Sequence, residues 1–208
     1  MNLDLVIRNG ILDTTGEPVE VGITGETIVA VEQEGLPAGV REIDAEGGMI
    51  SPPFVESHFH LENALIWDGA INESGTLHEA IELYAGIKRM LTVEDIVERA
   101  GRALRTAVAN GTLWLRSHVD IAKLSILEGV VAARDKYRDL VDVQLVAFPQ
   151  LGLARNPEAV DMMWAAMEHG CDLVGGMPHG ERDMDDAARH IEIAFEIAQA
   201  YDADVDMH

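Results

Sequence analysis

Apolar residues in the first part of the chain follow the spacing of β-strands. Leu3–Ile7 is rich in β-forming residues and is followed by Asn9-Gly10, a dipeptide that favours a tight turn. Val19–Ile23 and Thr27–Val31 are two further β-rich runs on either side of Gly25, and they predict a hairpin. No long helical period appears in this part, so we expect a small β-domain.

From residue 49 onward the pattern changes to strands followed by helices. Met49–His60 is expected to form a strand that the chain enters through Pro52 and Pro53, because proline cannot donate a hydrogen bond inside a sheet. Thr76-Leu-His-Glu79 is a capping box, and apolar residues at helical spacing follow it as far as Leu91. A helix is therefore expected after the first strand.

A regular alternation of helices and strands then continues along the chain. Thr92 begins a second helix, which Gly111 ends. The later strands are expected at Leu113–Val119, Val141–Phe148, Asp172–Met177 and Asp204–His208, and the helices between them at Leu124–Tyr137, Pro157–His169 and Asp185–Tyr201. Such alternation implies a parallel sheet with right-handed crossovers. Two architectures agree with it: a (β/α)₈ barrel with about five of its eight strands, or an open doubly wound sheet, although no glycine-rich phosphate loop follows the first strand.

The charge of the chain narrows the classes of partner. The 208 residues include 37 acidic and 15 basic side chains, for a formal charge of −22. This charge repels nucleic acid and anionic membranes, so we expect neither as a partner. It is consistent with an ordinary solvated acidic surface and also with adaptation to high salt, where screening removes the self-repulsion.

Cysteine content and the N-terminal residues point to a reducing compartment. Cys171 is the single cysteine, which excludes an intrachain disulfide and a cysteine-based zinc site. The residues after Met1 lack a basic segment followed by an apolar core, so no signal peptide is expected. No apolar run approaches the roughly 20 residues that span a bilayer. These features favour a cytoplasmic location.

Histidines at two predicted strand ends are the main candidates for chemistry. His58 and His60 point to the same face of the first strand, at the end where barrel enzymes place their active sites. Two imidazoles suit Zn²⁺ or Fe²⁺, although an isolated pair of this spacing is usually incidental. His208 shares a face of the fifth strand with Asp204 and Asp206, and in a closed barrel it meets the first pair. The alternative is a terminal histidine without a function.

Other polar residues near strand ends are weaker candidates. The amide of Gln150 can both donate and accept hydrogen bonds, as recognition of a lactam or amidine edge requires, although an exposed loop glutamine is the simpler interpretation. His118 and Asp120 end the second strand, where they either line a pocket or orient a neighbour. His179 ends the fourth strand and either lines the pocket or forms a hydrogen bond in the following loop. Glu62 receives no role.

These residues occur within a longer series of motifs that resembles a known family. The chain resembles the amidohydrolase superfamily and, within it, the cytosine deaminase group, which includes isopropylammelide hydrolase and other N-heterocycle hydrolases. The resemblance runs along nearly the whole chain, in the order Pro52-Pro-Phe-Val-Glu-Ser-His-Phe-His60, Ser74-Gly-Thr-Leu77, Arg116-Ser-His-Val-Asp120, Val146-Ala-Phe-Pro-Gln150, Cys171-Asp-Leu-Val-Gly-Gly-Met-Pro-His179 and Asp204-Val-Asp-Met-His208.

The resemblance implies an α/β fold with two domains. Residues 49–208 would be the first five strands of a (β/α)₈ TIM barrel that carries a metal-dependent hydrolase site. Residues 1–48 would be the N-terminal part of a small β-sandwich.

The resemblance also implies a set of site residues. His58, His60 and His208 match the ligands of one divalent ion, Fe²⁺ or Zn²⁺. In the family this ion generates a hydroxide that attacks an amidine-like carbon and expels ammonia or an amine. Gln150 matches the glutamine that hydrogen-bonds the heterocycle, and Leu77 matches an apolar residue of the same pocket. The expected substrate is a small N-heterocycle, such as a cytosine-like base, isocytosine, creatinine or an aminotriazine.

Two further expectations follow from what the segment contains. The fourth strand has no lysine, which favours a single-metal deaminase over a binuclear hydantoinase or dihydroorotase type. The proton-transfer glutamate and the eighth-strand aspartate of the family fall after the position of His208, so we expect no turnover by this chain alone.

We expect a homo-oligomer or a complementing C-terminal half. The alternatives are a non-catalytic or split-subunit amidohydrolase fragment and a cyclic-amide hydrolase of the same superfamily.

Overall fold

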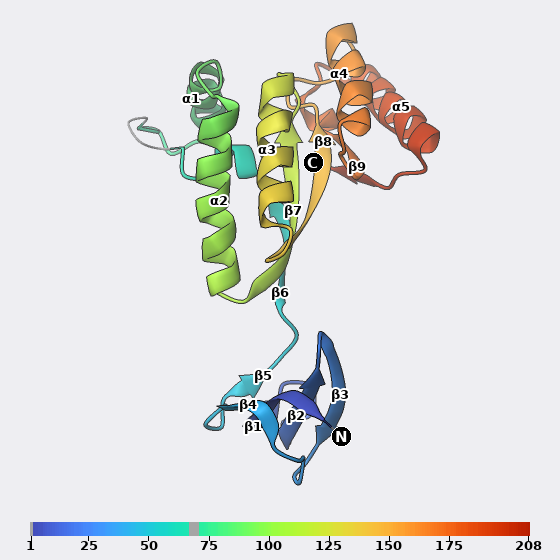
Figure 1. Ribbon diagram of the computed structural model, residues 1–208. Helices are drawn as coiled ribbons and strands as arrows, with labels where there is room; N and C mark the ends of the chain where they lie inside the picture. Colours follow the sequence, from blue (N-terminus) through green and yellow to red (C-terminus); the bar gives the residue numbers. More distant parts are fainter. Residues whose placement is uncertain (1, 67–70) are drawn as a thin grey trace. The chain divides into compact units, whose positions relative to one another are not determined.

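The computed structural model describes residues 2–66 and 71–208, and the chain divides into two compact units (Figure 1). The units are Met1–Pro52 and Pro53–His208. The division falls between two prolines, neither of which can donate a hydrogen bond to a neighbouring strand. Each unit contains its own sheet.

The N-terminal unit is a mixed five-stranded sheet. Its strands are β1 (Leu3–Leu12), β2 (Pro18–Thr24), β3 (Thr27–Glu32), β4 (Gly39–Asp44) and β5 (Met49–Ile50). The order is β3-β2-β1-β4, with β5 also pairing β1. The predicted hairpin is confirmed as the antiparallel pair of β2 and β3, whereas β4 and β5 run parallel to β1. The sequence pattern did not predict β4, most of which is exposed.

Two predictions for this unit were wrong. Strand β1 does not end at Asn9-Gly10. The strand continues through a bulge in which Asn9 adopts a φ of 56°, a conformation that asparagine tolerates. The predicted strand Met49–His60 is divided in two, because the prolines interrupt it. Its first two residues pair with β1 in the N-terminal sheet.

The second unit is a parallel α/β structure, as the alternating pattern predicted. Its sheet has the order β10-β9-β8-β7-β6, and every pair of neighbours is parallel. The strands are β6 (Phe54–Phe59), β7 (Thr112–Asp120), β8 (Asp142–Phe148), β9 (Leu173–Gly176) and β10 (Val205–Met207). The helices are α1 (Leu77–Ile87), α2 (Val93–Ala109), α3 (Leu124–Tyr137), α4 (Pro157–Glu168) and α5 (Met184–Tyr201), and short 3₁₀ turns η1 (Leu61–Asn63) and η2 (Pro178–Gly180) follow β6 and β9.

Capping residues explain where the helices begin. The Thr76 hydroxyl accepts a hydrogen bond from the Glu79 backbone N–H at 3.3 Å, and Thr92 accepts one from Asp95 at 3.2 Å. Each satisfies a backbone donor that the first helical turn leaves free. Helix α1 ends at Ile87, earlier than the predicted Leu91. None of the helices in the described ranges is long and apolar enough to cross a bilayer.

The core of the second unit lies between the strands and the helices that connect them. Helices α2 and α3 lie side by side along β7 (Figure 1). Their contact is close at Gly129 of α3, where an added Cβ would lie 2.8 Å from Ile96 Cβ. Ile96 is fully buried, so glycine is needed here to let the two helices approach.

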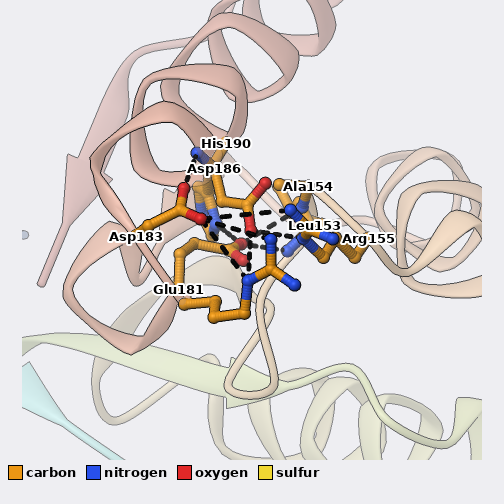
Figure 2. Close-up of polar contacts among 8 residues, drawn as sticks. Leu153, Ala154, Arg155, Glu181, Asp183, Asp186 and His190 are labelled. Atoms are coloured by element: carbon orange, nitrogen blue, oxygen red, sulfur yellow. Dashed lines mark hydrogen bonds and ion pairs between the residues drawn. The ribbon is translucent and has the colours of Figure 1, made fainter.

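A buried carboxylate joins two of the loops at the C-terminal ends of the strands. Glu181 Oε1 accepts hydrogen bonds from the Leu153 N–H at 2.7 Å and the Ala154 N–H at 3.1 Å, both in the loop after β8. The same oxygen lies 2.6 Å from His190 Nδ1 on α5, and His190 Nε2 accepts from the Met177 N–H at 3.1 Å. Figure 2 shows Glu181 among these partners. The network therefore ties the loop after β8 to the end of β9.

The close helix contact predicts opposite effects for two glycine substitutions. Gly129→Ala should lower the free energy of unfolding, because overpacking typically costs about 1–3 kcal/mol and outweighs the better helix propensity of alanine. Gly86→Ala on α1 is the matched control, since a Cβ there meets nothing within 4 Å. The control should be stabilised by roughly 0.5–1 kcal/mol. Urea denaturation of both variants measures the difference, and equal losses would contradict the steric explanation.

The Glu181 network predicts a pH-dependent contribution to stability. Burial opposes ionisation of Glu181, but the hydrogen bonds from His190, Leu153 and Ala154 outweigh it and lower the carboxyl pKa below its ordinary value of 4.5. A depressed pKa stabilises the fold above the unfolded-state value, and this contribution is lost as pH falls through the folded-state pKa. Glu181→Gln should therefore be less stable than the parent at neutral pH, and the gap should narrow in acid.

Urea titrations at several pH values measure this gap. Glu196→Gln, which removes an exposed acid from helix α5, controls for the loss of one charge. A gap between the parent and Glu181→Gln that stays constant from neutral to acid pH would refute the ionic role of Glu181.

Candidate metal centre

Four imidazoles lie together at the C-terminal ends of three parallel strands. His58 is near the end of β6 and His60 follows that strand, His118 lies near the end of β7, and His208 follows β10. The ring centroids of His58, His118 and His208 are 4.5–4.6 Å apart. The His60 ring lies 5.5–5.7 Å from the other three. The structure thus brings the three predicted ligands together and adds a fourth histidine.

Backbone pairing places these side chains at one level. Phe59 pairs with Ser117, so His118 and His60 each follow one member of that pair. The His208 N–H donates to the Gly176 carbonyl at 2.8 Å, which fixes the last residue against β9. The convergence of the rings is therefore a consequence of the parallel register.

Among the described residues, the histidines with the most closely grouped ligand atoms are His58, His118 and His208. One ring nitrogen from each lies within 4.8 Å of the others. Two imidazoles bound to one tetrahedral ion have ring centres about 5 Å apart, given metal–nitrogen distances near 2.0–2.1 Å. The spacing of all four rings is close to this value. Sequence reasoning treated His118 only as a pocket or orienting residue, because it belongs to no HxH pair.

His118 has the environment of an unprotonated ligand. The side chain is fully buried, and neither ring nitrogen has a hydrogen-bond partner in the described part of the chain. Burial, reinforced by the neighbouring His208 and His58, lowers its pKa to about 4, even though Asp206 opposes the shift. At neutral pH the ring is therefore uncharged with a free lone pair. Buried nitrogens without partners carry a desolvation cost that a bound cation would relieve, so the donor set fits a divalent metal ion.

The other rings differ in their surroundings. Burial, followed by the nearby His58 and His60, lowers the pKa of His208. For His60 burial opposes protonation, but the Glu62 carboxylate outweighs it and raises the pKa. Asp206 lies behind the cluster, where its Oδ2 accepts from Arg116 Nη1 at 2.6 Å and its Oδ1 is 3.3 Å from His118 Nε2. Burial opposes ionisation of Asp206, but these two contacts outweigh it and lower the pKa.

A cavity of about 250 Å³ adjoins the imidazole cluster. Its walls include His60 and His208 together with Leu77, Phe148, Gln150 and Met177. The volume is slightly below the roughly 300–1,000 Å³ of pockets for drug-sized ligands, so it suits a small molecule. Two predicted substrate contacts, Gln150 and Leu77, thus line the same cavity as two predicted metal ligands.

His179 is placed differently from the other predicted site residues. It lies in the η2 turn after β9, where it is exposed and is not part of the cavity wall. Met177, two residues earlier, reaches the cavity instead. A substrate contact by His179 stays a prediction.

Comparison with known proteins connects this arrangement to a family. Residues 41–208 match the profile of the Amidohydrolase family. N-isopropylammelide isopropyl amidohydrolase from Pseudomonas sp. (strain ADP) is 29% identical over 219 aligned residues, which cover 100% of this chain and 53% of that protein. Pterin deaminase from Rhizobium rhizogenes is 27% identical over 178 residues, which cover 83% of this chain and 40% of that protein.

Solved structures agree with the sequence matches. The 5-methylcytosine deaminase from Klebsiella pneumoniae, liganded with 5-fluorocytosine, superposes with a TM-score of 0.90 at 33% identity and covers 98% of this chain and 50% of that chain. N-isopropylammelide isopropylaminohydrolase from Burkholderia multivorans gives a TM-score of 0.83 at 28% identity, covering 100% of this chain and 53% of that chain.

These matches define the fold of the second unit. The chain spans about half the length of the relatives it matches. Its five-stranded parallel sheet corresponds to half of a TIM barrel, as predicted, and the mixed N-terminal sheet is a separate unit. By profile, sequence and structure, this chain belongs to the amidohydrolase family.

Proposed function

We propose that this chain supplies the metal-binding half of a hydrolytic deaminase that acts on a non-peptide C–N bond of a small N-heterocycle. The observation that carries the proposal is the convergence of strand-end imidazoles beside a small, mostly apolar cavity that contains Gln150. The names of the relatives support it, since they include a 5-methylcytosine deaminase and two isopropylammelide hydrolases.

We assign the metal ligands to His58, His60 and His208, with His118 as a buried neutral ring behind them. His60 and His208 both line the cavity, so a ligand in the cavity has access to them. Neither His58 nor His118 is part of the wall, and His58 is assigned as a ligand because it forms the HxH pair with His60. Imidazole donors bind both Fe²⁺ and Zn²⁺, and the proposal takes one ion of either kind. When bound, such an ion supplies Lewis acidity, which lowers the pKa of a coordinated water to about 7.

The cavity residues have complementary roles in the proposal. The Gln150 amide can donate one hydrogen bond and accept another, which matches the alternating N–H and C=O groups of a lactam edge. The Leu77 and Phe148 side chains provide apolar surface for the ring faces. Gln150 lies in the loop after β8. Hydrogen bonds through Glu181 and His190 connect this loop to the end of β9, which limits the positions that Gln150 can take.

Metal titration of the chain tests the ligand assignment. His58→Ala, His60→Ala and His208→Ala should each weaken Co²⁺ or Zn²⁺ binding more than about 100-fold, since loss of a ligand exceeds the 10–100-fold effect of losing an outer partner. His118→Ala should have a smaller effect. His78→Ala, an exposed ring on α1, should leave the affinity unchanged. Competition with a chromophoric chelator provides the measurement.

Two outcomes of that titration count against the assignment. Absence of binding by the parent chain would refute a metal centre built from these residues. A large loss for His118→Ala together with no loss for His60→Ala would instead make His58, His118 and His208 the ligands.

The reaction itself requires more of the barrel than this chain contains. We propose that the 208-residue chain alone gives no turnover, because its parallel sheet has five strands and leaves β6 and β10 as edges. Phe54 and Val55 of β6 are 63% and 66% exposed, which fits an edge that a complementing half or a second copy covers.

An assay of ammonia release, or of isopropylamine release when isopropylammelide is the substrate, tests this expectation. Cytosine, isocytosine, creatinine and isopropylammelide would be offered to the metal-loaded chain, alone and together with a C-terminal half-barrel from a relative. We expect no turnover by the chain alone. Steady turnover without any added polypeptide would show that the five-stranded unit is catalytically sufficient.

A further inference from the structure

We propose that Glu62 is the positioning residue for His60: its buried carboxylate accepts a hydrogen bond from His60 Nδ1 and leaves Nε2 free to face the imidazole cluster. The inference rests on the proposed function in taking His60 as a metal ligand. Glu62 would act through His60 and would not itself touch the metal ion or the substrate.

Glu62 is an acid in an unusual place. It has no exposed surface, although it lies in the short η1 turn directly after β6. The turn is fixed because the Leu61 N–H donates to the buried Ser117 hydroxyl at 3.0 Å. An ionised carboxylate is costly to bury unless charged or hydrogen-bonding partners surround it. The protein therefore needs a partner for Glu62 at this position.

The partners of the Glu62 carboxylate are incomplete without His60. Its Oε1 accepts from the Asp120 N–H at 3.3 Å and lies 3.6 Å from His60 Nδ1. Its Oε2 and His60 Nδ1 are both buried and have no hydrogen-bond partner within residues 2–66 and 71–208. A shortening of a few tenths of an ångström between His60 Nδ1 and Glu62 Oε1 would give the imidazole nitrogen an acceptor and the carboxylate a second donor beside the Asp120 N–H.

The nearby cations are engaged elsewhere. Lys88 Nζ donates to Asp120 Oδ2 at 2.7 Å. Arg99 Nη1 donates to the backbone carbonyls of Glu62 and Ala64 at 2.9 and 2.6 Å, and its other nitrogens bind Asp95. Neither cation forms a hydrogen bond to the carboxylate of Glu62. Among the described residues, the Tyr84 hydroxyl is another buried donor without a partner, and burial, followed by the charge of Glu62, raises its pKa.

Lys88 and Asp120 hold the carboxylate in place. Asp120 is 1% exposed, and its Oδ1 accepts from the Ala122 N–H at 2.9 Å while Lys88 binds its Oδ2. Its own N–H then points to Glu62. The path Lys88–Asp120–Glu62–His60 therefore links α1 and the end of β7 to the ring of the proposed ligand.

This arrangement selects one tautomer of His60. With Nδ1–H directed to a carboxylate, the lone pair of the neutral ring lies on Nε2. Metal-binding histidines commonly donate their second nitrogen to a carboxylate in this way, and loss of that outer partner typically weakens metal binding about 10–100-fold. Sequence reasoning assigned Glu62 no role, because no local pattern shows that its carboxylate is buried.

The test compares Glu62 with a matched buried acid. The Glu181 side chain is 7% exposed and also lies against an imidazole Nδ1, that of His190, but in the network between the loops after β8 and β9. We expect Glu62→Ala to weaken Zn²⁺ or Co²⁺ binding by the chain about 10–100-fold and Glu62→Gln, which retains a carbonyl acceptor, to weaken it less. Glu181→Gln should leave the metal affinity unchanged.

A second readout follows the tautomer directly. Nitrogen-15 NMR of the histidine rings in the metal-free chain, at mildly alkaline pH, should show His60 with its proton on Nδ1 in the parent. In Glu62→Ala that preference should be lost, while the His190 signal stays unchanged. A change that only loosened the fold would not move the His60 tautomer selectively.

The outcomes separate this inference from the proposed function. Unchanged metal affinity and an unchanged His60 tautomer in Glu62→Ala would overturn the role of Glu62 even if the parent binds metal. No metal binding by the parent would refute the proposed function, and the tautomer would still decide whether Glu62 positions His60. If circular dichroism shows that Glu62→Ala is unfolded, Glu62→Gln decides by the same two measurements.

Discussion

Parallel strand pairing is the constraint on which the candidate site depends. When neighbouring strands run in the same direction, their carboxyl ends lie at one edge of the sheet, and the residues just before and after those ends face each other. His58, His118 and His208 come from strands that span most of the second unit's sequence, yet their ring centroids lie within 4.6 Å of each other. The hydrophobic contacts between strands and helices maintain this register, and the chemistry of the site follows from it.

The site concentrates neutral nitrogen donors within a strongly acidic chain. Burial lowers the pKa of His118 and of His208, and the neighbouring imidazoles lower it further because protonated rings so close together would repel one another. Two carboxylates lie next to the rings, Asp206 beside His118 and Glu62 beside His60. The negative charge of these carboxylates favours binding of a cation among the rings. Imidazole ligands are themselves uncharged, so they leave a bound cation Lewis acidic.

Much of the fold follows from local patterns that the sequence displays directly. The boundaries of α3 and the starting points of α1 and α2 agree with prediction, since apolar spacing and capping residues act within one or two helical turns. The same local rules did not predict β4, a mostly exposed strand without an apolar face. They also missed the continuation of β1 through Asn9, because that bulge is held by a hydrogen bond from Asn9 to the distant Asp44.

The sequence by itself determined the alternating α/β order, the three histidines at strand ends and the resemblance to amidohydrolases, because each of these depends on residue identity and spacing along the chain. Only the tertiary structure decided that His118 joins the cluster, that Met177 lines the cavity while His179 is exposed, and that Glu62 is buried against His60. The physical reason is that burial and the distance between side chains depend on how strands and loops far apart in sequence pack together. No local spacing rule contains that information.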